Sequence, residues 1–185
     1  MKTCGILALQ GDFAAHAKAV ERAGGIAVEI RTPTELALCD GLIIPGGESS
    51  TMLKLLAFEG LTEPIQRFAA SKPVYGSCAG AILLAQEVSH PAQASLGLMD
   101  ISVERNAYGR QIDSRISHVK IDGETELEAV FIRAPIIRRV GAGVTTVGRY
   151  QDNPVWVEQG RLMATTFHPE LTNDNRVHER FLSWL

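Results

Sequence analysis

The chain has 185 residues, of which 45% are hydrophobic and 21% are charged, and its formal net charge is −3. This length suits a protein with one full hydrophobic core, so we expect a single domain over residues 1–185. The weakly acidic balance argues against a nucleic acid or an anionic membrane as partner.

The first half of the chain alternates apolar runs of strand length with helical patterns. The expected strands cover residues 4–9, 26–30, 41–44 and 73–75. The expected helices cover residues 13–23, 33–38, 51–58, 63–70 and 79–85. Continuous apolar runs suit central strands that are buried on both faces, and the alternation predicts a doubly wound, mostly parallel α/β sheet.

The second half has a different pattern, in which short strands are separated by glycines such as Gly123 and Gly160. The expected strands cover residues 98–103, 116–121, 129–132, 144–150, 154–158 and 161–166. We interpret them as an antiparallel extension on the same domain. A closing helix is expected over residues 175–185, with Val177 and Phe181 on its apolar face.

Three widely spaced cysteines, Cys4, Cys39 and Cys78, argue against a disulfide framework and for a reducing compartment. The chain begins almost directly with a strand pattern, so we expect no cleavable leader, and no apolar run reaches membrane-spanning length. We therefore expect a cytoplasmic protein with no membrane partner.

Residues 73–85 carry the strongest functional pattern. A short apolar run leads into Gly76, Cys78 and Gly80 with G-x-C-x-G spacing, and a helical pattern starts at Ala79. This is the sequence form of a nucleophile elbow with cysteine as the nucleophile. The glycines leave room around the strained central residue, and the N-terminus of the helix favours a thiolate there. A buried structural cysteine beside helix-packing glycines is the alternative for this motif alone.

Two further segments follow apolar strand patterns, and open α/β sheets bind ligands at the carboxyl ends of their strands. The first is P-G-G-E-S-S-T at residues 45–51. There the N–H of Gly47 is expected to hold an oxyanion together with the N–H of Ala79. A plain loop in which Ser50 or Thr51 caps the next helix is the alternative.

The second segment is T-F-H-P-E-L at residues 166–171. Pro169 biases His168 to an extended conformation, in which His168 and Glu170 point to the same side. His168 can then serve as acid and base for Cys78, while Glu170 orients the imidazole. A turn without a catalytic role is the alternative for H-P-E alone. The other histidines have no metal-ligand spacing with the cysteines, so we expect no metal and no cofactor.

Together these motifs resemble those of the class I glutamine amidotransferases. Over nearly its whole length the chain resembles the glutaminase subunits of pyridoxal 5′-phosphate synthases, including L-Q-G-D at residues 9–12 with His16. The segments E-R-N-A-Y-G-R-Q at residues 104–111 and F-I-R-A-P at residues 131–135 are the most specific to these subunits. The resemblance implies a flavodoxin-like amidotransferase fold.

The resemblance also implies a role for each matching residue. It makes Cys78 the nucleophile, His168 the acid and base, and Glu170 the orienting residue. The residues that it places near bound L-glutamine are Gly47, Glu48, Ser49, Arg105, Ile132 and Arg133. An arginine can pair with the α-carboxylate of glutamine, and Glu48 can assist with the α-ammonium group.

The implied reaction is the hydrolysis of L-glutamine to L-glutamate and ammonia through a thioester on Cys78. The implied partner is a (β/α)₈-barrel synthase subunit, arranged as a ring, which uses the ammonia to build pyridoxal 5′-phosphate (vitamin B6).

Three other functions stay open at this point. A peptidase-like or glyoxalase-like hydrolase often carries an acidic residue at the end of the first strand, where this chain has Gln10. A glutaminase of another pathway is excluded only by the resemblance of residues 104–111 and 131–135. A non-catalytic interaction subunit usually loses the cysteine, histidine or glutamate, and this chain keeps all three.

Overall fold

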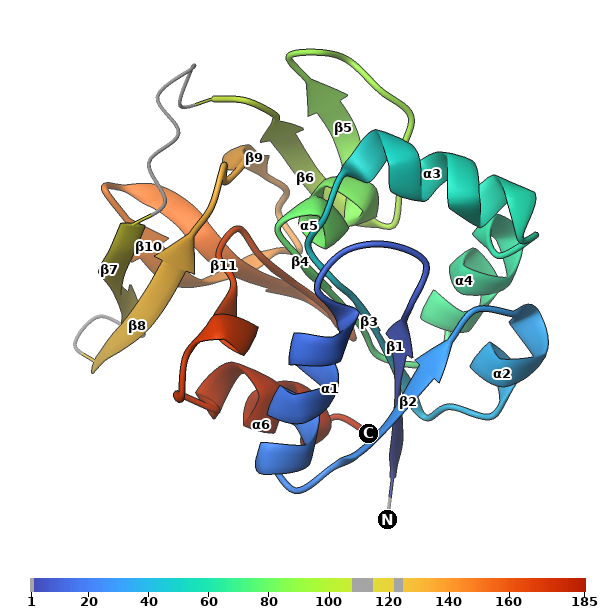
Figure 1. Ribbon diagram of the computed structural model, residues 1–185. Helices are drawn as coiled ribbons and strands as arrows, with labels where there is room; N and C mark the ends of the chain where they lie inside the picture. Colours follow the sequence, from blue (N-terminus) through green and yellow to red (C-terminus); the bar gives the residue numbers. More distant parts are fainter. Residues whose placement is uncertain (1, 108–114, 122–124) are drawn as a thin grey trace.

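The computed structural model of the chain describes residues 2–107, 115–121 and 125–185 (Figure 1). Residues 108–111 of the E-R-N-A-Y-G-R-Q segment, and Gly123, lie outside the described residues. In the part of the chain that is described, no helix has both the length and the apolar character needed to cross a membrane.

The elements follow one another largely in the predicted alternation. In the first half they are β1 (Thr3–Leu7), α1 (Phe13–Arg22), β2 (Ile26–Ile30), α2 (Pro33–Ala37), β3 (Gly41–Ile44), α3 (Ser49–Phe58), α4 (Thr62–Ala69), β4 (Val74–Ser77) and α5 (Ala79–Leu84). In the second half they are β5 (Ala85–Ser89), β6 (Met99–Glu104), β7 (Arg115–Ile121), β8 (Thr125–Phe131), β9 (Ile136–Val140), β10 (Thr145–Tyr150), β11 (Asn153–Gln159), β12 (Leu162–Thr165), the 3₁₀ helix η1 (Pro169–Leu171) and α6 (Arg176–Leu182).

A nine-stranded sheet runs through the molecule in the order β2-β1-β3-β4-β12-β11-β10-β7-β8. From β2 to β12 neighbouring strands are parallel, and from β12 to β8 they are antiparallel. The prediction of a mostly parallel sheet with an antiparallel extension is therefore confirmed. Because β12 pairs with β4, the segment after β12 is brought close to the segment after β4.

Helices cover both faces of the parallel strands (Figure 1). Helices α1 and α6 share one hydrophobic core with side chains such as Ile43, and α2 to α5 share the other with side chains such as Leu42 and Ile44. Successive residues of a strand point to opposite faces, which explains why neighbours in β3 belong to different cores. The predicted doubly wound arrangement is confirmed.

Two strands, β5 and β9, are not predicted from the sequence. They flank β6 in a separate three-stranded sheet, so the expected strand at residues 98–103 belongs to this sheet and not to the antiparallel extension. Charged residues interrupt the apolar pattern of both missed strands: Glu87 in β5, and Arg138 and Arg139 in β9. The expected helix at residues 79–85 ends one residue early because Ala85 is already extended, with a ψ of 146°.

Candidate active site

Cys78 lies at the sharp turn between β4 and α5. Its φ is 49°, in the left-handed region, and its N–H donates to the carbonyl of Thr165 at 2.8 Å. A Cβ on Gly76 would lie 2.5 Å from the backbone of Gly80, and a Cβ on Gly80 would overlap the carbonyl oxygen of Ile44. The motif glycines therefore allow the close approach of strand and helix that the sequence predicts.

His168 lies beside Cys78 and is held by Glu170. Nδ1 of His168 is 2.7 Å from Oε1 of Glu170, and both residues are buried. A Cβ on Gly46 would lie 2.5 Å from Cε1 of His168 and 3.4 Å from Cβ of Cys78, so both side chains lie against the same backbone. Burial alone lowers the pKa of His168, but hydrogen bonds with Cys78 and Glu170 raise it to about 10. The imidazole is therefore protonated at neutral pH, as the partner of a thiolate needs to be.

The loop after β3 brings peptide groups to the same place. The carbonyl of Gly46 accepts a hydrogen bond from the N–H of Asp12 at 3.1 Å. Because the peptide bond is planar and trans, the N–H of Gly47 points away from Asp12. Among the described residues, no hydrogen bond uses the N–H of Gly47 or the N–H of Ala79. Both groups predicted to hold an oxyanion thus have a free hydrogen.

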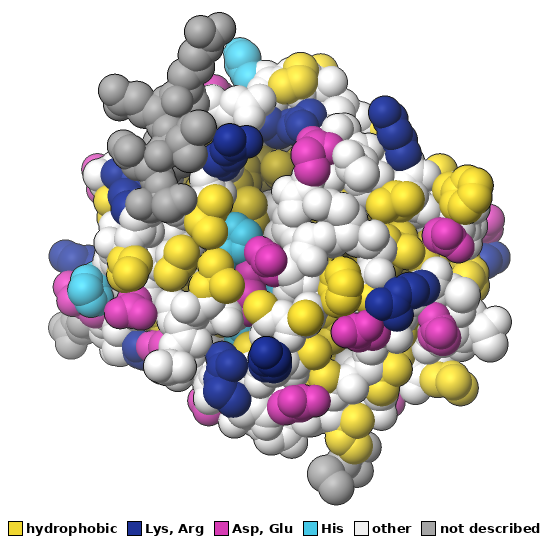
Figure 2. All heavy atoms as spheres, in the orientation of Figure 1, with side chains coloured by type: hydrophobic (Ala, Val, Ile, Leu, Met, Phe, Trp, Pro, Cys, Tyr) yellow, Lys and Arg dark blue, Asp and Glu magenta, His cyan; other side chains and the backbone are white. Residues whose placement is uncertain are grey.

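A cavity of about 270 Å³ opens beside Cys78. In the space-filling view, a hollow on this face shows histidine and acidic side-chain atoms between hydrophobic ones (Figure 2). The predicted glutamine-site residues that line the cavity are Gly47, Glu48, Ser49, Arg105 and Arg133. Gln10, Asn106 and Pro135 line it as well, and the sequence analysis gives none of them a place in the glutamine site.

Glu48 is the N-cap of α3. Its carboxylate accepts hydrogen bonds from the N–H groups of Ser50 and Thr51 at 3.3 and 2.7 Å, so the alternative in which Ser50 or Thr51 caps the helix is wrong. The hydroxyl of Ser50, together with these backbone donors, lowers the pKa of Glu48 to about 2. Oε1 of Glu48 also lies 3.1 Å from Nη2 of Arg105. Glu48 therefore positions Arg105 at the cavity.

The segment F-I-R-A-P lies against the other side of Cys78. Sγ of Cys78 is 3.8 Å from the carbonyl oxygen of Ile132, so this contact is made by the backbone of Ile132. Arg133 and Asn106, which line the cavity, have φ values of 44° and 53°. Non-glycine residues in this strained region often cluster at functional sites, and here they share a cavity with the equally strained Cys78.

Two histidines that the sequence leaves without a chemical role lie behind Glu170. Nε2 of His16 is 3.3 Å from Oε2 of Glu170 and 2.8 Å from Oγ of Ser77. Nδ1 of His16 is 3.1 Å from Nε2 of His178. All four residues are buried. The sequence links His16 with the site, because His16 lies next to the L-Q-G-D segment. Nothing in the sequence connects His178 with the site.

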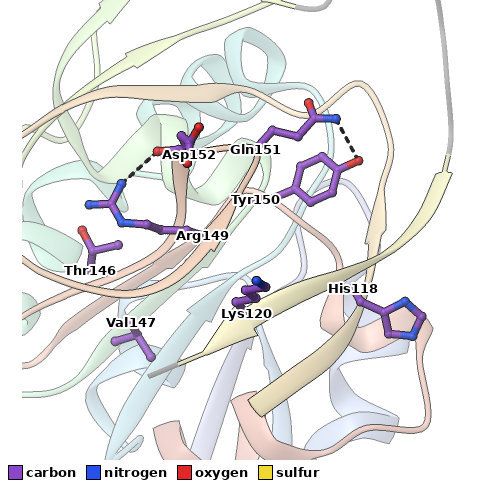
Figure 3. Close-up of a pocket in the computed structure, with 8 residues that line it drawn as sticks. All are labelled: His118, Lys120, Thr146, Val147, Arg149, Tyr150, Gln151 and Asp152. Atoms are coloured by element: carbon purple, nitrogen blue, oxygen red, sulfur yellow. Dashed lines mark hydrogen bonds between the residues drawn. The ribbon is translucent and has the colours of Figure 1, made fainter. Parts of the chain in front are cut away.

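A larger cavity, of about 700 Å³, lies on the antiparallel extension (Figure 3). Side chains from β7 and β10 border it, including His118, Lys120 and Tyr150. Arg149 at its edge donates a hydrogen bond to the carbonyl of Asp152 at 2.8 Å. Among the described residues that line this cavity, none is a cysteine and none is a predicted site residue. Its size alone does not make it the reaction site.

Asp12, His168 and Glu170 bring possible metal-ligand atoms within 4.8 Å of one another. Nδ1 of His168 and Oε1 of Glu170 are, however, already engaged with each other. The absence of a bound metal in the working protein stays a prediction.

Comparison with known proteins decides the family. The sequence model of the SNO glutamine amidotransferase family matches residues 6–185. The chain belongs to this family. The predicted resemblance to glutamine amidotransferases is thereby confirmed.

Curated relatives within the family carry a more specific name. The protein "Pyridoxal 5′-phosphate synthase subunit PdxT" of Solibacter usitatus is 57% identical over 192 residues, and the match covers 100% of each chain. The protein of the same name from Deinococcus radiodurans is 49% identical, covering 97% of this chain and 95% of the relative.

A solved structure described as a glutamine amidotransferase superposes with a TM-score of 0.92 at 44% identity, covering 98% of this chain and 97% of the other. The structure of PurLQS from Thermotoga maritima gives a TM-score of 0.73 at 17% identity, covering 100% and 99% of the two chains, which shows a shared fold alone.

Proposed function

We propose that the protein is the glutaminase subunit of a pyridoxal 5′-phosphate synthase and hydrolyses L-glutamine to L-glutamate and ammonia. The observation that carries the proposal is the strained Cys78 beside the His168–Glu170 pair, at the edge of a cavity. This arrangement offers a nucleophile, an acid and base, and a group that orients the base. Membership of an amidotransferase family supports an amide as substrate.

In the first stage the Cys78 thiolate attacks the side-chain amide carbon of glutamine. The N–H groups of Gly47 and Ala79 hold the oxyanion that forms. Since Nδ1 of His168 is engaged with Glu170, Nε2 carries the proton that goes to the leaving nitrogen. Ammonia departs and leaves the glutamyl thioester on Cys78.

In the second stage the neutral His168 takes a proton from water, and the hydroxide attacks the thioester carbonyl. The same two N–H groups hold the second oxyanion. Its collapse releases L-glutamate and expels the Cys78 thiolate, while the protonated His168 restores the starting pair. Glu170 stabilises the imidazolium at each stage at which it forms.

Substrate binding draws on the charges around the cavity. L-Glutamine carries an α-carboxylate and an α-ammonium group on one carbon atom. The guanidinium of Arg105 and the carboxylate of Glu48 are 3.1 Å apart, so they present the two opposite charges at matching spacing. Ser49, Ile132 and Arg133 complete the proposed glutamine site.

The pathway and the partner rest on the relatives. These are named as subunits of pyridoxal 5′-phosphate synthase, so we assign this chain to the same assembly. Its partner in this proposal is a (β/α)₈-barrel synthase subunit arranged as a ring, which takes up the ammonia, and both work in the cytoplasm. A free glutaminase would waste glutamine, which makes a coupled partner chemically sensible.

The nucleophile can be tested with a glutamine analogue that carries a chloroketone in place of the amide. All three cysteines are buried, but only Cys78 among them lines the cavity, so mass spectrometry of tryptic peptides should find the adduct on Cys78 and not on Cys4 or Cys39. Excess L-glutamine should slow the labelling. Labelling that L-glutamine does not slow, or that is equal at the three cysteines, would contradict the proposal.

A further inference from the structure

The buried pair His16 and His178 continues the line of polar contacts that starts at Cys78. His168 contacts one carboxylate oxygen of Glu170, and His16 contacts the other. His16 in turn contacts His178, whose ring lies with its centre 5.3 Å from that of His16. Both histidines are completely buried and the triad mechanism uses neither. The protonation states of His16 and His178 determine how these residues interact with Glu170.

The buried partners select the tautomer of each ring. Nδ1 of His178 is buried without a hydrogen-bond partner among the described residues. An unpaired lone pair costs less there than an unpaired N–H, so the proton of His178 sits on Nε2. His178 then donates to Nδ1 of His16, and His16 carries its own proton on Nε2. That proton is directed at Oγ of Ser77, which is 2.8 Å from Nε2. Oε2 of Glu170 lies 3.3 Å from the same nitrogen and has no hydrogen-bond partner among the described residues.

The opposite tautomer fails on two counts. A proton on Nδ1 of His16 would make His178 the acceptor at Nε2 and leave an N–H unpaired at Nδ1 of His178. The bare Nε2 of His16 could accept from the hydroxyl of Ser77, but its lone pair would lie 3.3 Å from Oε2 of Glu170, where both groups are electron-rich. The first arrangement places a polar hydrogen beside the carboxylate, whereas the second places a lone pair there.

We propose that His16 is a positioning residue of the triad: in a tautomer fixed by His178, its Nε2–H bonds to Ser77 and places a positive partial charge beside the second oxygen of Glu170. This charge favours the position of Glu170 in which its first oxygen is aligned with Nδ1 of His168. This inference rests on the proposed function for its kinetic consequences. The tautomers themselves are independent of what the substrate is.

Both rings are neutral in this arrangement. Burial lowers the pKa of His16, and the nearby His168 lowers it further. The negative charges of Glu170 and Asp12 raise it, but by less. Burial also lowers the pKa of His178, to about 3, with His16 and Arg22 acting in the same direction and Glu170 against them. A neutral imidazole offers one donor and one acceptor, which is what the chain of contacts requires.

The test compares two variants at one position in the full-length protein. His16→Gln keeps a donor and an acceptor on a planar amide, whereas His16→Leu removes both. His118→Leu is the matched control, since His118 is an exposed histidine of β7 far from the triad in the sheet order. We expect His16→Leu to lower kcat for glutamine by about 10- to 100-fold with little change in KM, because a buried electrostatic contact with a charged group is lost.

His16→Gln should recover most of the lost kcat, and His118→Leu should match the wild type. The pH profile of Cys78 alkylation is a second readout. A poorly held Glu170 lowers the pKa of His168, which weakens the imidazolium that stabilises the thiolate and moves the onset of alkylation to higher pH. A folded His16→Leu protein with wild-type kcat and an unchanged alkylation profile would overturn the inference. Cys78→Ala, assayed in parallel, tests the proposed function separately, because it should abolish turnover whatever His16 does.

A measurement on the wild-type protein covers the case in which the His16 variants do not fold. The ¹⁵N chemical shifts of the imidazoles show which ring nitrogen carries the proton. We expect a proton on Nε2 of both His16 and His178 at pH 7. A proton on Nδ1 of His16, or a doubly protonated His16, would overturn the inference.

Discussion

Nδ1 of His168 lies 2.7 Å from Oε1 of Glu170, with only Pro169 between them in the chain. The prediction that this segment is extended is wrong, because Pro169 opens the 3₁₀ helix η1, which contains Glu170. The tight turn still lets two residues of one short segment supply a base and its orienting carboxylate. The nucleophile comes from the neighbouring strand β4, which pairs with β12 in parallel. Adjacent parallel strands therefore assemble the proposed triad.

Replacement of Glu170 tests this relationship. Glu170→Gln keeps the size of the side chain but removes the negative charge that stabilises the imidazolium. We expect kcat to fall by about 10³- to 10⁴-fold, as for the loss of the orienting carboxylate in other triads. The pKa of His168 should also fall, because its hydrogen bond with Glu170 helps to raise it. Steady-state kinetics and histidine NMR titration check both outcomes, and an unaltered His168 titration would argue against the role of Glu170.

The loop glycines give a second prediction. A Cβ on Gly47 would overlap Oε1 of Gln10, which also accepts the N–H of Glu48. Gly47→Val should therefore displace the loop and abolish glutaminase activity while leaving the fold intact. Gly143→Ala is the control, because its new Cβ would meet only Nε2 of Gln159 at 3.7 Å. Circular dichroism reports the fold, and unchanged turnover in Gly47→Val would remove Gly47 from the oxyanion site.

The elbow glycine Gly80 should matter for stability and not only for activity. A Cβ there would overlap the carbonyl oxygen of Ile44, a backbone atom that cannot rotate away. We expect Gly80→Ala to lower the free energy of unfolding by about 1–3 kcal/mol, the usual cost of overpacking a core. Urea unfolding measures this, and a Gly80→Ala protein as stable as Gly143→Ala would contradict the close packing of β3 and α5.

The sequence predicts this part of the site well because each motif acts locally. The spacing of Gly76, Cys78 and Gly80 encodes the turn, and the single residue between His168 and Glu170 keeps their side chains within reach of each other. The parallel strands that carry them are mostly apolar and almost completely buried, so their order along the chain indicates the sheet.

The remaining features depend on contacts between distant residues. His178 meets His16 across 162 positions of sequence, and no local pattern marks that contact. Glu48 caps α3 although Ser50 and Thr51 are closer to the usual cap types, because its longer side chain reaches both N–H groups. The sequence analysis also misses strands β5 and β9. Their charged residues, such as Glu87 and Arg139, face away from the core and so interrupt the apolar pattern.

Arg105 provides a prediction about substrate affinity. Its side chain is mostly buried, is paired with Glu48 and lines the cavity, and in our proposal it receives the α-carboxylate of glutamine. Arg105→Lys loses the planar fork, so KM should rise by about 10-fold or more with a smaller change in kcat. Arg67→Lys is the control, because Arg67 is exposed and pairs only with Glu63 one helical turn away. An unchanged KM in Arg105→Lys would remove Arg105 from the glutamine site.

The buried histidines predict a pH dependence of stability. The pKa of His178 in the folded protein is about 3, below the ordinary value of 6.5, so the unfolded chain binds a proton more readily than the folded one. The stabilisation that comes from a neutral His178 should therefore be complete above about pH 6.5 and be lost as the pH drops towards 3. Between pH 6.5 and 5 the carboxylates change their protonation little. In this interval the pH dependence of the free energy of unfolding therefore comes mainly from the histidines. His178→Gln should flatten the fall in that interval, and an equal slope in both proteins would contradict a neutral, buried His178.

Glutamate release from L-glutamine, measured for the protein alone and with the barrel synthase subunit added, is the most direct test of the central claim. Wild type and Cys78→Ala should be compared under both conditions. We expect strong release by the wild type when the synthase is present and none by Cys78→Ala. No release by the wild type in either condition, or release that survives in Cys78→Ala, would contradict the assignment of a Cys78-dependent glutaminase.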